Sequence, residues 1–471
     1  MGRPEKQRLI LLASVVLFIS QVTYCMLFPV LPAIILEIAN NDAGNAALLY
    51  TSFSSLSRGL QLLAAPFLGT LSDVWGRKPV LLQSLIITGL CSFLMAYQRS
   101  FWYFLLAHLM LGLGHITKPV CYTIAADLTE SDKKEDGVHR VKAFANMGVA
   151  CSVALGLGPV AGAVISVVKS AEYTLLISGV LNLTAAILVV STQFYGRQRC
   201  IKGVDLHVSH RFNFCCPRLP FKDREMGLAT VSYLLAFISS TIGFGVYSIW
   251  YIYTANRYGW STLDNGLFLS GYGLLMSLSQ GPLLRWLVPN RISEDEAISS
   301  SLWINLWIFV GFGTAVNTYM VVLFLPLVIM GGFVDPLLRT KLAGLACTED
   351  QGTLQGFLYS TSSLCTIVGG TVSSVLIAAA DSTTSIELNI FGQSIPATAG
   401  APFYFGAILF LLAICMIKYN SRYGATEFQE VANEQEALLQ LKRSSSMNSS
   451  EFLYKAAKPQ ESKSKNETIL I

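Results

Sequence analysis

Charged residues are scarce in this chain of 471 residues. Asp, Glu, Lys and Arg together make up 13% of it, about half of their share in soluble proteins, whereas hydrophobic residues make up 53%. The mean hydropathy of +0.52 agrees with this balance. So few charges cannot supply the surface of a soluble protein. We therefore predict an integral, multi-pass membrane protein embedded in a lipid bilayer.

Several motifs that carry chemistry are missing as well. The sequence has no G-x-x-x-x-G-K-S/T loop for nucleotide phosphates, which excludes a hydrolysis-driven pump within this chain. No pattern typical of a catalytic nucleophile occurs, and nothing indicates a cofactor or a nucleic acid partner. The sequence therefore does not predict an enzyme.

The ten Cys do not have the distribution of a disulfide framework. They are scattered over apolar segments and one polar interval, which is typical of reduced thiols. The polar interval 196–225 holds three Cys and two His, but their spacing matches no structural zinc site, so we predict no metal there. A solvated linker is favoured, with lipidation of its adjacent Cys pair as a further interpretation. These residues are Cys200, His207, His210, Cys215 and Cys216.

Apolar runs long enough to span a bilayer, which takes about 20 residues, occur twelve times. The polar interval separates the first six from the last six. We predict an all-α fold of 12 transmembrane helices in two six-helix bundles, residues 1–195 and 226–418, with a cytoplasmic linker at 196–225 and a disordered cytoplasmic tail at 419–471. The runs lie near 9–36, 47–71, 79–98, 101–126, 142–168, 173–195, 226–255, 263–288, 298–318, 319–346, 353–380 and 400–418.

The distribution of Lys and Arg orients these helices, because cytoplasmic loops carry an excess of both. If the N-terminus is cytoplasmic, the outer loops keep only Arg99, Lys169 and Arg257, and the basic clusters all lie inside. Both termini are therefore predicted to be cytoplasmic.

A dense charged cluster lies between the second and third apolar runs: Gly69-Thr-Leu-Ser-Asp73-Val-Trp-Gly76-Arg77-Lys78-Pro79. Glycine has no Cβ, so Gly69 permits close helix approach and Gly76 a tight turn. Pro79 suits the first turn of the next helix. The pattern G-x-L-x-D-x-x-G-R-K resembles the loop between the second and third helices of the major facilitator superfamily. An ordinary positive-inside hairpin is the alternative.

Further motifs extend this resemblance along the chain. Ala154-x3-Gly158-Pro159-x2-Gly162-Ala163 is similar to the fifth-helix motif of the drug/proton antiporter branch, in which small residues allow close packing and the proline bends the helix. Gln351-Gly-Thr-Leu-Gln355-Gly356 resembles the tetracycline antiporter type, as do Phe28-Pro29-Val-Leu-Pro32 and Gln61 with Pro66.

Residues 71–78, Leu-Ser-Asp-Val-Trp-Gly-Arg-Lys, are closer still to the hippocampus-abundant-transcript family. Two features depart from the antiporter pattern. Ser20 and Gln21 lie near the place where those relatives carry an acid, and His108 lies where the family often has an arginine. A complete proton-coupled drug mechanism is therefore not implied.

The superfamily resemblance implies a contact between the two bundles at the charged loop. Asp73 would meet the positive end of the helix that starts near Thr348-Glu-Asp-Gln351, which has the form of a capping box. Arg77 would face Asp127 at the inner end of the fourth helix. The predicted gating motif consists of Gly69, Asp73, Gly76, Arg77, Lys78 and Asp127.

Ionisable side chains within apolar runs are costly and therefore indicate function. Lys118-Pro119 precedes Thr129-Glu130 much as Asp335-Pro336 precedes Thr348-Glu349, which suggests pseudo-symmetric halves. We predict that Lys118 and Asp335 pair between the bundles in an outward-open state. The alternative is that each is satisfied within its own bundle, Asp335 by Arg339 one turn further on.

Arg58 lies near the middle of its helix, and the first six helices offer no acid at similar depth. It favours an anionic group on the substrate; the alternatives are bonds to helix carbonyls and snorkelling between the bundles. Asp335, His108 and His115 are candidates for proton coupling, with satisfied core histidines as the alternative. Weaker candidates, which polar helix–helix contacts would equally explain, are Gln21, Tyr24, Gln61, Asn146, Tyr247, Trp250 and Gln280.

These features predict a secondary active transporter of a small organic solute, with an anionic solute and proton coupling as open options. The alternative is a non-transporting sensor or sorting protein with a transporter fold. Glu434-Gln-Glu-Ala-Leu438-Leu439 in the tail has the form of an adaptor-binding sorting signal or of an amphipathic helix. The plasma membrane and an endolysosomal membrane both remain possible locations.

Overall fold

The computed structural model describes residues 3–39, 43–97, 100–129, 135–192, 224–288, 291–346, 350–382, 387–390, 393–396 and 400–419, and nearly all of them are helical. The N-terminal half (residues 3–192) contains α1 (Arg3–Met26), α2 (Leu31–Ile38), α3 (Ala43–Trp75), α4 (Arg77–Tyr97), α5 (Phe101–Gly114), α6 (Thr117–Leu128), α7 (Glu135–Val168) and α8 (Ala171–Ser191).

The C-terminal half (residues 224–418) is more interrupted. Its elements are α9 (Arg224–Phe244), η2 (Gly245–Ile249), α10 (Trp250–Tyr258), α11 (Thr262–Leu278), η3 (Ser279–Leu283), α12 (Leu284–Leu287), α13 (Glu294–Thr314), α14 (Thr318–Phe324), η4 (Leu325–Leu327), α15 (Val328–Gly331), α16 (Val334–Leu345) and α17 (Gln351–Ser382). The last helix is Ala401–Tyr419. An unpredicted hairpin of β1 (Glu387–Ile390) and β2 (Gln393–Pro396) precedes it, antiparallel, with Leu388 opposite Ile395.

Within the described residues, ten helical segments are long and apolar enough to cross a membrane. They coincide with ten of the twelve predicted spans. The other two predicted spans, 47–71 and 263–288, lie in α3 and in α11–α12, which are helical but more polar because they carry several serines together with Arg58, Gln61 and Gln280. The count of twelve spans and the cytoplasmic position of the termini stay predictions.

Prolines divide several runs that the sequence predicted as single helices. Proline lacks an N–H, and its ring clashes with the carbonyl four residues earlier. The run 9–36 is split between α1 and α2 around Pro29, and the run 101–126 between α5 and α6 just before Pro119. The run 319–346 is split at Leu325–Leu327 and again before Pro336. In contrast, α7 continues through Pro159.

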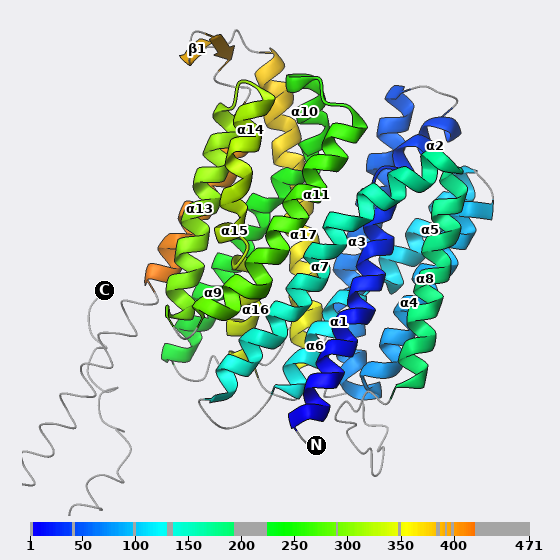
Figure 1. The fold of residues 1–471 in the computed structure, drawn as a ribbon, viewed down its shortest axis with the longest axis vertical. Helices are drawn as coiled ribbons and strands as arrows, with labels where there is room; N and C mark the ends of the chain where they lie inside the picture. The colour runs from blue at the N-terminus through cyan, green and yellow to red at the C-terminus, as the bar shows by residue number, and fades with distance from the viewer. Residues whose placement is uncertain are drawn as a thin grey trace, which may run out of the picture. The chain divides into compact units, whose positions relative to one another are not determined.

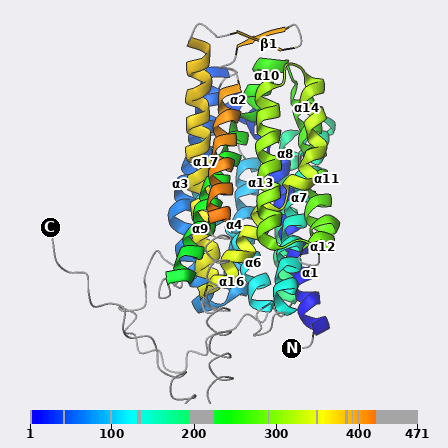
Figure 2. The same ribbon diagram turned by 90° about the vertical axis from the view of Figure 1, so that its left-hand side faces the viewer.

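The two halves pack against each other along two pairs of helices. The α3 helix lies beside α17, and the two views of the ribbon agree on this placement (Figures 1 and 2). On the other side, α7 lies against α11, and it also contacts α12 and α16. One cluster of buried apolar side chains draws on both halves, which is consistent with a single compact unit for Met1–Lys418.

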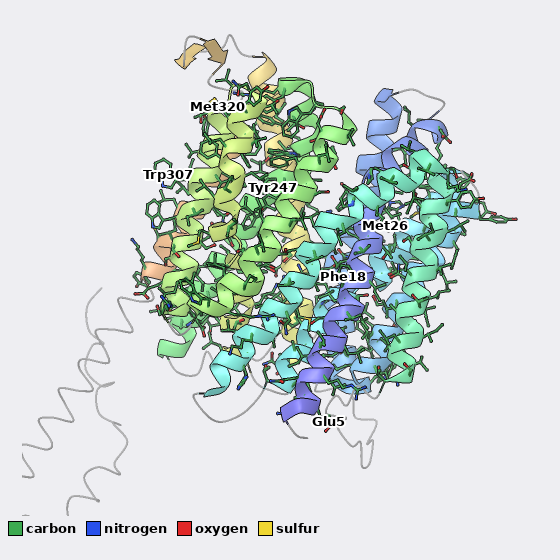
Figure 3. The ribbon with its side chains drawn as sticks, viewed as in Figure 1. Glu5, Phe18, Met26, Tyr247, Trp307 and Met320 are labelled. Atoms are coloured by element: carbon green, nitrogen blue, oxygen red, sulfur yellow. The ribbon has the colours of Figure 1, made fainter. Side chains whose placement is uncertain are left out.

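Large apolar side chains cover much of the outer face. Val167 is 85% exposed, Leu323 is 73% exposed and Trp307 is 58% exposed. Trp307 projects outward from α13, whereas Tyr247 lies among the helices (Figure 3). Apolar exposure on this scale is what lipid contact requires and what soluble proteins avoid.

Some predictions concern residues outside this description. The linker up to residue 223, including its Cys and His residues, is not among the described residues, and neither is the tail with Glu434, Leu438 and Leu439. Within the described ranges, no group of His, Cys, Asp and Glu side chains is arranged to hold a metal ion.

Candidate functional site

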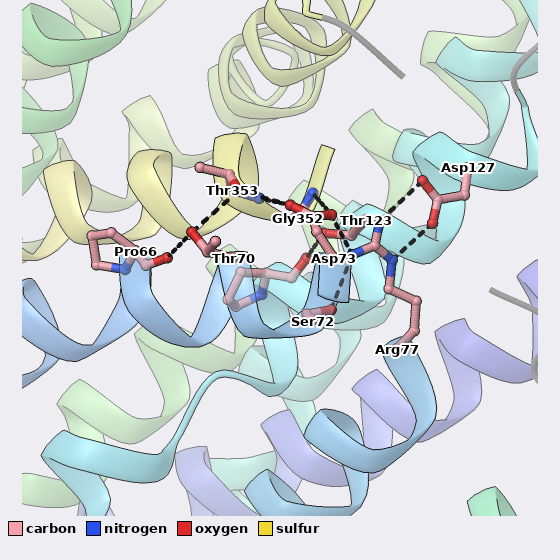
Figure 4. A network of polar contacts seen from close by, with 10 residues as sticks. Pro66, Thr70, Ser72, Asp73, Arg77, Thr123, Asp127, Gly352 and Thr353 are labelled. Atoms are coloured by element: carbon pink, nitrogen blue, oxygen red, sulfur yellow. Dashed lines mark hydrogen bonds and ion pairs between the residues drawn. The ribbon is translucent and has the colours of Figure 1, made fainter. Parts of the chain in front are cut away.

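The carboxylate of Asp73, at the end of α3, caps the first turn of α17 in the opposite half. Its two oxygens accept hydrogen bonds from the N–H groups of Gly352 at 2.9 Å and Thr353 at 2.7 Å, and from the Thr353 hydroxyl at 2.7 Å (Figure 4). First-turn N–H groups have no partner within their own helix, and they carry the positive end of the helix dipole. We call this contact of Asp73 with Gly352 and Thr353 the clasp.

Arg77 supports the clasp from within the N-terminal half. Its guanidinium donates to Asp127 at 2.8 Å, to Asp73 at 2.5 Å and to Ser72 at 3.1 Å, and the side chain is only 7% exposed. The structure thus brings together Asp73, Arg77 and Asp127, the set that the resemblance implies. The capping-box residues Thr348 and Glu349 lie outside the described residues.

Two glycines of the loop allow this geometry. Gly76 has a φ of 97°, a left-handed conformation that side chains rarely tolerate, and it separates α3 from α4. A Cβ on Gly69 would lie 2.5 Å from the carbonyl oxygen of Gly352, so α3 and α17 can approach only without it. Lys78 has a different role, since its ammonium group donates to the carbonyls of Val190 and Thr192 at the end of α8.

The small residues of α7 pack that helix onto α1. A Cβ on Gly158 would meet the Cβ of Cys25 at 2.5 Å, and a Cβ on Gly162 would collide with the carbonyl oxygen of Met26. Pro159 lies between them without ending the helix. This motif therefore sets the spacing of two helices within one half.

Asp335 is held by two cations, one from each half. The buried Arg339, 2% exposed, donates to it at 2.9 Å from one turn further along α16. The Lys118 ammonium of α6 lies 3.9 Å from its other oxygen. The ion pair between the halves, Lys118 with Asp335, and the pair within one half, Arg339 with Asp335, are thus both present. Because Arg339 also donates to Gln355 at 3.3 Å and lies over the rings of Tyr122 and Phe237, it is the more firmly held partner.

The two histidines are buried and already have hydrogen-bond partners. His108 Nδ1 lies 2.8 Å from the carbonyl oxygen of Phe104, and His115 Nδ1 lies 3.1 Å from the hydroxyl of Thr88. The ring of His115 also stacks on Tyr24 with 5.9 Å between centroids. These contacts are those of satisfied core histidines.

Arg58 is a half-buried cation in α3 that, within the described residues, forms no hydrogen bond or ion pair. Tyr359 of α17 lies within electrostatic range of Arg58 and of Tyr24 in α1. Gln21 lies half-buried one turn before Tyr24 on the same helix. Arg58 therefore offers a positive charge that no described side chain neutralises, within electrostatic range of α17.

Asn146 and Gln280, like Gln61, lie at the contact between the halves. Arg285 of α12 donates to the amide oxygen of Asn146 in α7. Gln280 accepts from the hydroxyl of Ser152 in α7 and donates to the carbonyl of Gly332. Tyr247 and Trp250 are placed differently, in an aromatic cluster of the C-terminal half, where Trp250 is 2% exposed and stacks on Phe268 with 4.8 Å between centroids.

Sequence reasoning missed the partners supplied by the opposite half. Thr353, Ser152 and Ser363 each bond across the interface, and none of them was singled out. The sequence marks two of them only by their position next to a motif. Thr353 lies in the motif that opens α17, and Ser152 lies just before the small-residue motif of α7.

Comparison with known families assigns the chain to a protein family. Residues 13–370 match the family model of the Major Facilitator Superfamily. The chain belongs to this superfamily. A similar member is the tetracycline resistance protein, class C, of Escherichia coli, 28% identical over 365 residues, covering 76% of this chain and 87% of that protein. Hippocampus abundant transcript-like protein 1 of Homo sapiens is 23% identical over 381 residues, covering 79% and 74%.

Solved structures show the same fold. The human organic anion transporter MFSD10 (TETRAN) has a TM-score of 0.67 and 21% identity, covering 88% of this chain and 100% of that chain. The Escherichia coli fucose:proton symporter FucP has a TM-score of 0.58 and 14% identity, covering 87% and 97%. The predicted resemblance to the tetracycline antiporter and hippocampus-abundant-transcript types is confirmed. The protein is a multi-pass, antiporter-like member of this superfamily, and both of these solved structures are of transporters.

Proposed function

We propose that the protein is a secondary active transporter that moves a small organic anion across its membrane by alternating access. The clasp is the observation that carries this proposal. Two halves joined at one end by a carboxylate on a helix N-terminus can separate without unfolding either half, because both partners can be hydrated when they part. With the N-terminus in the cytoplasm, the clasp closes the cytoplasmic end and leaves an outward-open state.

The anionic character of the solute follows from the charges in the interior. In the part of the chain that the structure describes, Arg58, Lys118 and Arg339 outnumber the one carboxylate, Asp335, that lies among them. An unpaired cation within a bilayer is costly, so a bound anion would stabilise Arg58. The similarity to an organic anion transporter supports the same choice.

We assign proton coupling to Asp335. Its carboxylate, 40% exposed, is the acidic group of the charged set, and its protonation would release Lys118 while Arg339 kept its bond to Gln355. Anion uptake driven by a proton gradient, with Asp335→Asn insensitive to that gradient, is the expected result. Uptake with a flat pH dependence in the unmodified protein would remove proton coupling from the proposal.

The full chain reconstituted in liposomes tests the main proposal with two probes, the organic anion fluorescein and the organic cation tetraphenylphosphonium. We expect saturable uptake of fluorescein alone. Arg58→Gln should lower that uptake about 10–100-fold, the effect of losing one charge-assisted hydrogen bond of about 1.5–3 kcal/mol, while Arg58→Lys retains part of it. Uptake of the cation only, or fluorescein uptake that ignores Arg58, would refute the anionic assignment.

The second candidate function, a sensor or sorting protein, depends on the tail and not on the interior charges. Ending the chain after residue 419 should leave fluorescein uptake unchanged if the protein is a transporter. A cell-surface or endolysosomal location that changes with Leu438→Ala and Leu439→Ala would then mark the tail as a separate sorting signal.

A further inference from the structure

Two helix breaks occupy equivalent places in the two halves. The α5–α6 pair breaks after Gly114, and the α15–α16 pair breaks after Gly331. In an unbroken helix the carbonyl of His115 would accept from the N–H of residue 119, and that of Gly332 from residue 336. Both of those residues are prolines, which have no N–H, so each break leaves a main-chain carbonyl without its helical donor.

A glutamine supplies the missing donor in each half. The amide nitrogen of Gln61, in α3, donates to the carbonyl of His115 at 3.3 Å. The amide nitrogen of Gln280, in η3, donates to the carbonyl of Gly332 at 2.9 Å. A Cβ on Gly148 of α7 would collide with the amide oxygen of Gln280. The glycine therefore leaves the space that the glutamine side chain occupies.

On the other side of each break, a serine hydroxyl accepts a hydrogen bond from a main-chain N–H. The N–H of Ile116 donates to the Ser84 hydroxyl at 2.9 Å, and the N–H of Phe333 donates to the Ser301 hydroxyl at 3.3 Å. The same number of residues separates Ser84 from Ser301, Ile116 from Phe333 and Pro119 from Pro336. The two breaks are therefore copies of one design, with a serine on the N–H side and a glutamine on the carbonyl side.

Each glutamine also reaches the other half. The hydroxyl of Ser363, in α17, lies 3.2 Å from the amide oxygen of Gln61 and shares its one hydrogen between that oxygen and the carbonyl of Tyr359, 3.1 Å away on its own helix. The hydroxyl of Ser152, in α7, donates to the amide oxygen of Gln280 at 3.0 Å. Both serines are buried. One carboxamide thus bonds a helix break in its own half and a helix of the opposite half.

We propose that Gln61 and Gln280 are positioning residues of alternating access, which rests on the proposed transport function. Each glutamine keeps the carbonyl at its proline break bonded in every state, because that bond lies within one half. The bond to Ser363 or Ser152 crosses the interface and has to break when the clasp opens. The two glutamines therefore link the bend of each broken helix to the separation of the halves.

A double-mutant cycle on the full chain in detergent tests the link between glutamine and proline without any transport assay. Gln280→Met should lower the Tm in the native background because the carbonyl of Gly332 loses its donor. In a Pro336→Ala background residue 336 has an N–H again, so the same change should lower the Tm by less than half as much. Likewise, Gln61→Met should lower the Tm in the native background and should lower it by less than half as much in a Pro119→Ala background.

Gln351→Met is the matched control. Gln351 is as buried as Gln280 and also donates to main-chain carbonyls, those of Ala343 in α16 and of Ala346 just after it, at the end remote from the proline. Its effect on the Tm should be the same with Pro336 or Ala at that position. Equal Tm losses for Gln280→Met in both backgrounds would overturn the assigned role of the glutamine.

Hydrogen exchange at the clasp tests the link between the halves. The N–H groups of Gly352 and Thr353 bond to Asp73, so their exchange reports how often the clasp opens. Ser152→Ala and Ser363→Ala should each speed this exchange about fivefold, the effect of one neutral hydrogen bond, with little change in Tm. Unchanged exchange in both variants would overturn the coupling, and would do so whether or not the protein transports fluorescein.

Discussion

Replacing Asp73 with asparagine is expected to slow transport at least about tenfold while leaving the affinity for the solute nearly unchanged. The carboxylate offers two charged oxygens to Gly352 and Thr353, whereas an amide offers one neutral oxygen and a repelling NH₂ group. Losing one hydrogen bond to a charged acceptor costs about 1.5–3 kcal/mol, which shifts the balance between clasped and open states about 10–100-fold. Arg58 and its neighbours are untouched, so binding should survive.

Two measurements check this result on the same variant. Uptake of fluorescein into liposomes gives the turnover and the half-saturating concentration, and hydrogen exchange at Gly352 and Thr353 gives the opening of the clasp. Lys78→Gln is the matched control, because among the described residues Lys78 bonds only to the carbonyls of Val190 and Thr192 in its own half, so its loss should not change that exchange. If Asp73→Asn abolishes solute binding, the clasp is not a gate.

Replacing Asp335 with asparagine is expected to cost about 3 kcal/mol in the free energy of unfolding. Removing one partner of a buried ion pair leaves the other charge uncompensated, at about 3–5 kcal/mol, and the partial exposure of Asp335 places the effect at the lower end. The charge left behind is that of Arg339, which is 2% exposed and would retain only Gln355 as a hydrogen-bond acceptor. Chemical unfolding in detergent measures the change.

Lys118→Met is the matched control for this prediction. Lys118 lies 3.9 Å from Asp335 and is 26% exposed, so its loss should cost less than about 1 kcal/mol. A charge swap between positions 118 and 335 is not an equivalent test, because a lysine at 335 would face Arg339. Equal losses for Lys118→Met and Asp335→Asn would show that the ion pair between the halves is the stronger of the two.

Periodic and local features of this molecule could be predicted from the sequence. Apolar runs located the helices, and the sequence from Gly69 to Lys78 indicated both the superfamily and the turn at Gly76. These predictions succeed because both the hydropathy of a run and the left-handed conformation of a glycine depend on neighbouring residues alone. The pairing of Lys118 with Asp335 was also within reach, because the Lys-Pro and Asp-Pro repeat places both charges at the same point of equivalent helices.

The glutamine contacts could not be predicted in the same way. Gln61 and Gln280 were only two of several polar residues in apolar helices, and their partners, Ser363 and Ser152, come from the opposite half. Such pairs depend on how two helices distant in sequence are rotated against each other. Trp250 shows the converse, because this candidate for the solute site packs into an aromatic core instead.

Hydrogen exchange of Gly352 and Thr353 in proteoliposomes, with and without fluorescein on both sides, tests the central claim most directly. If the clasp opens during each transport cycle, saturating fluorescein should speed the exchange of these two N–H groups in the native protein, and Arg58→Gln should remove the effect. Exchange that stays the same in the native protein at every fluorescein concentration that supports uptake would contradict the account.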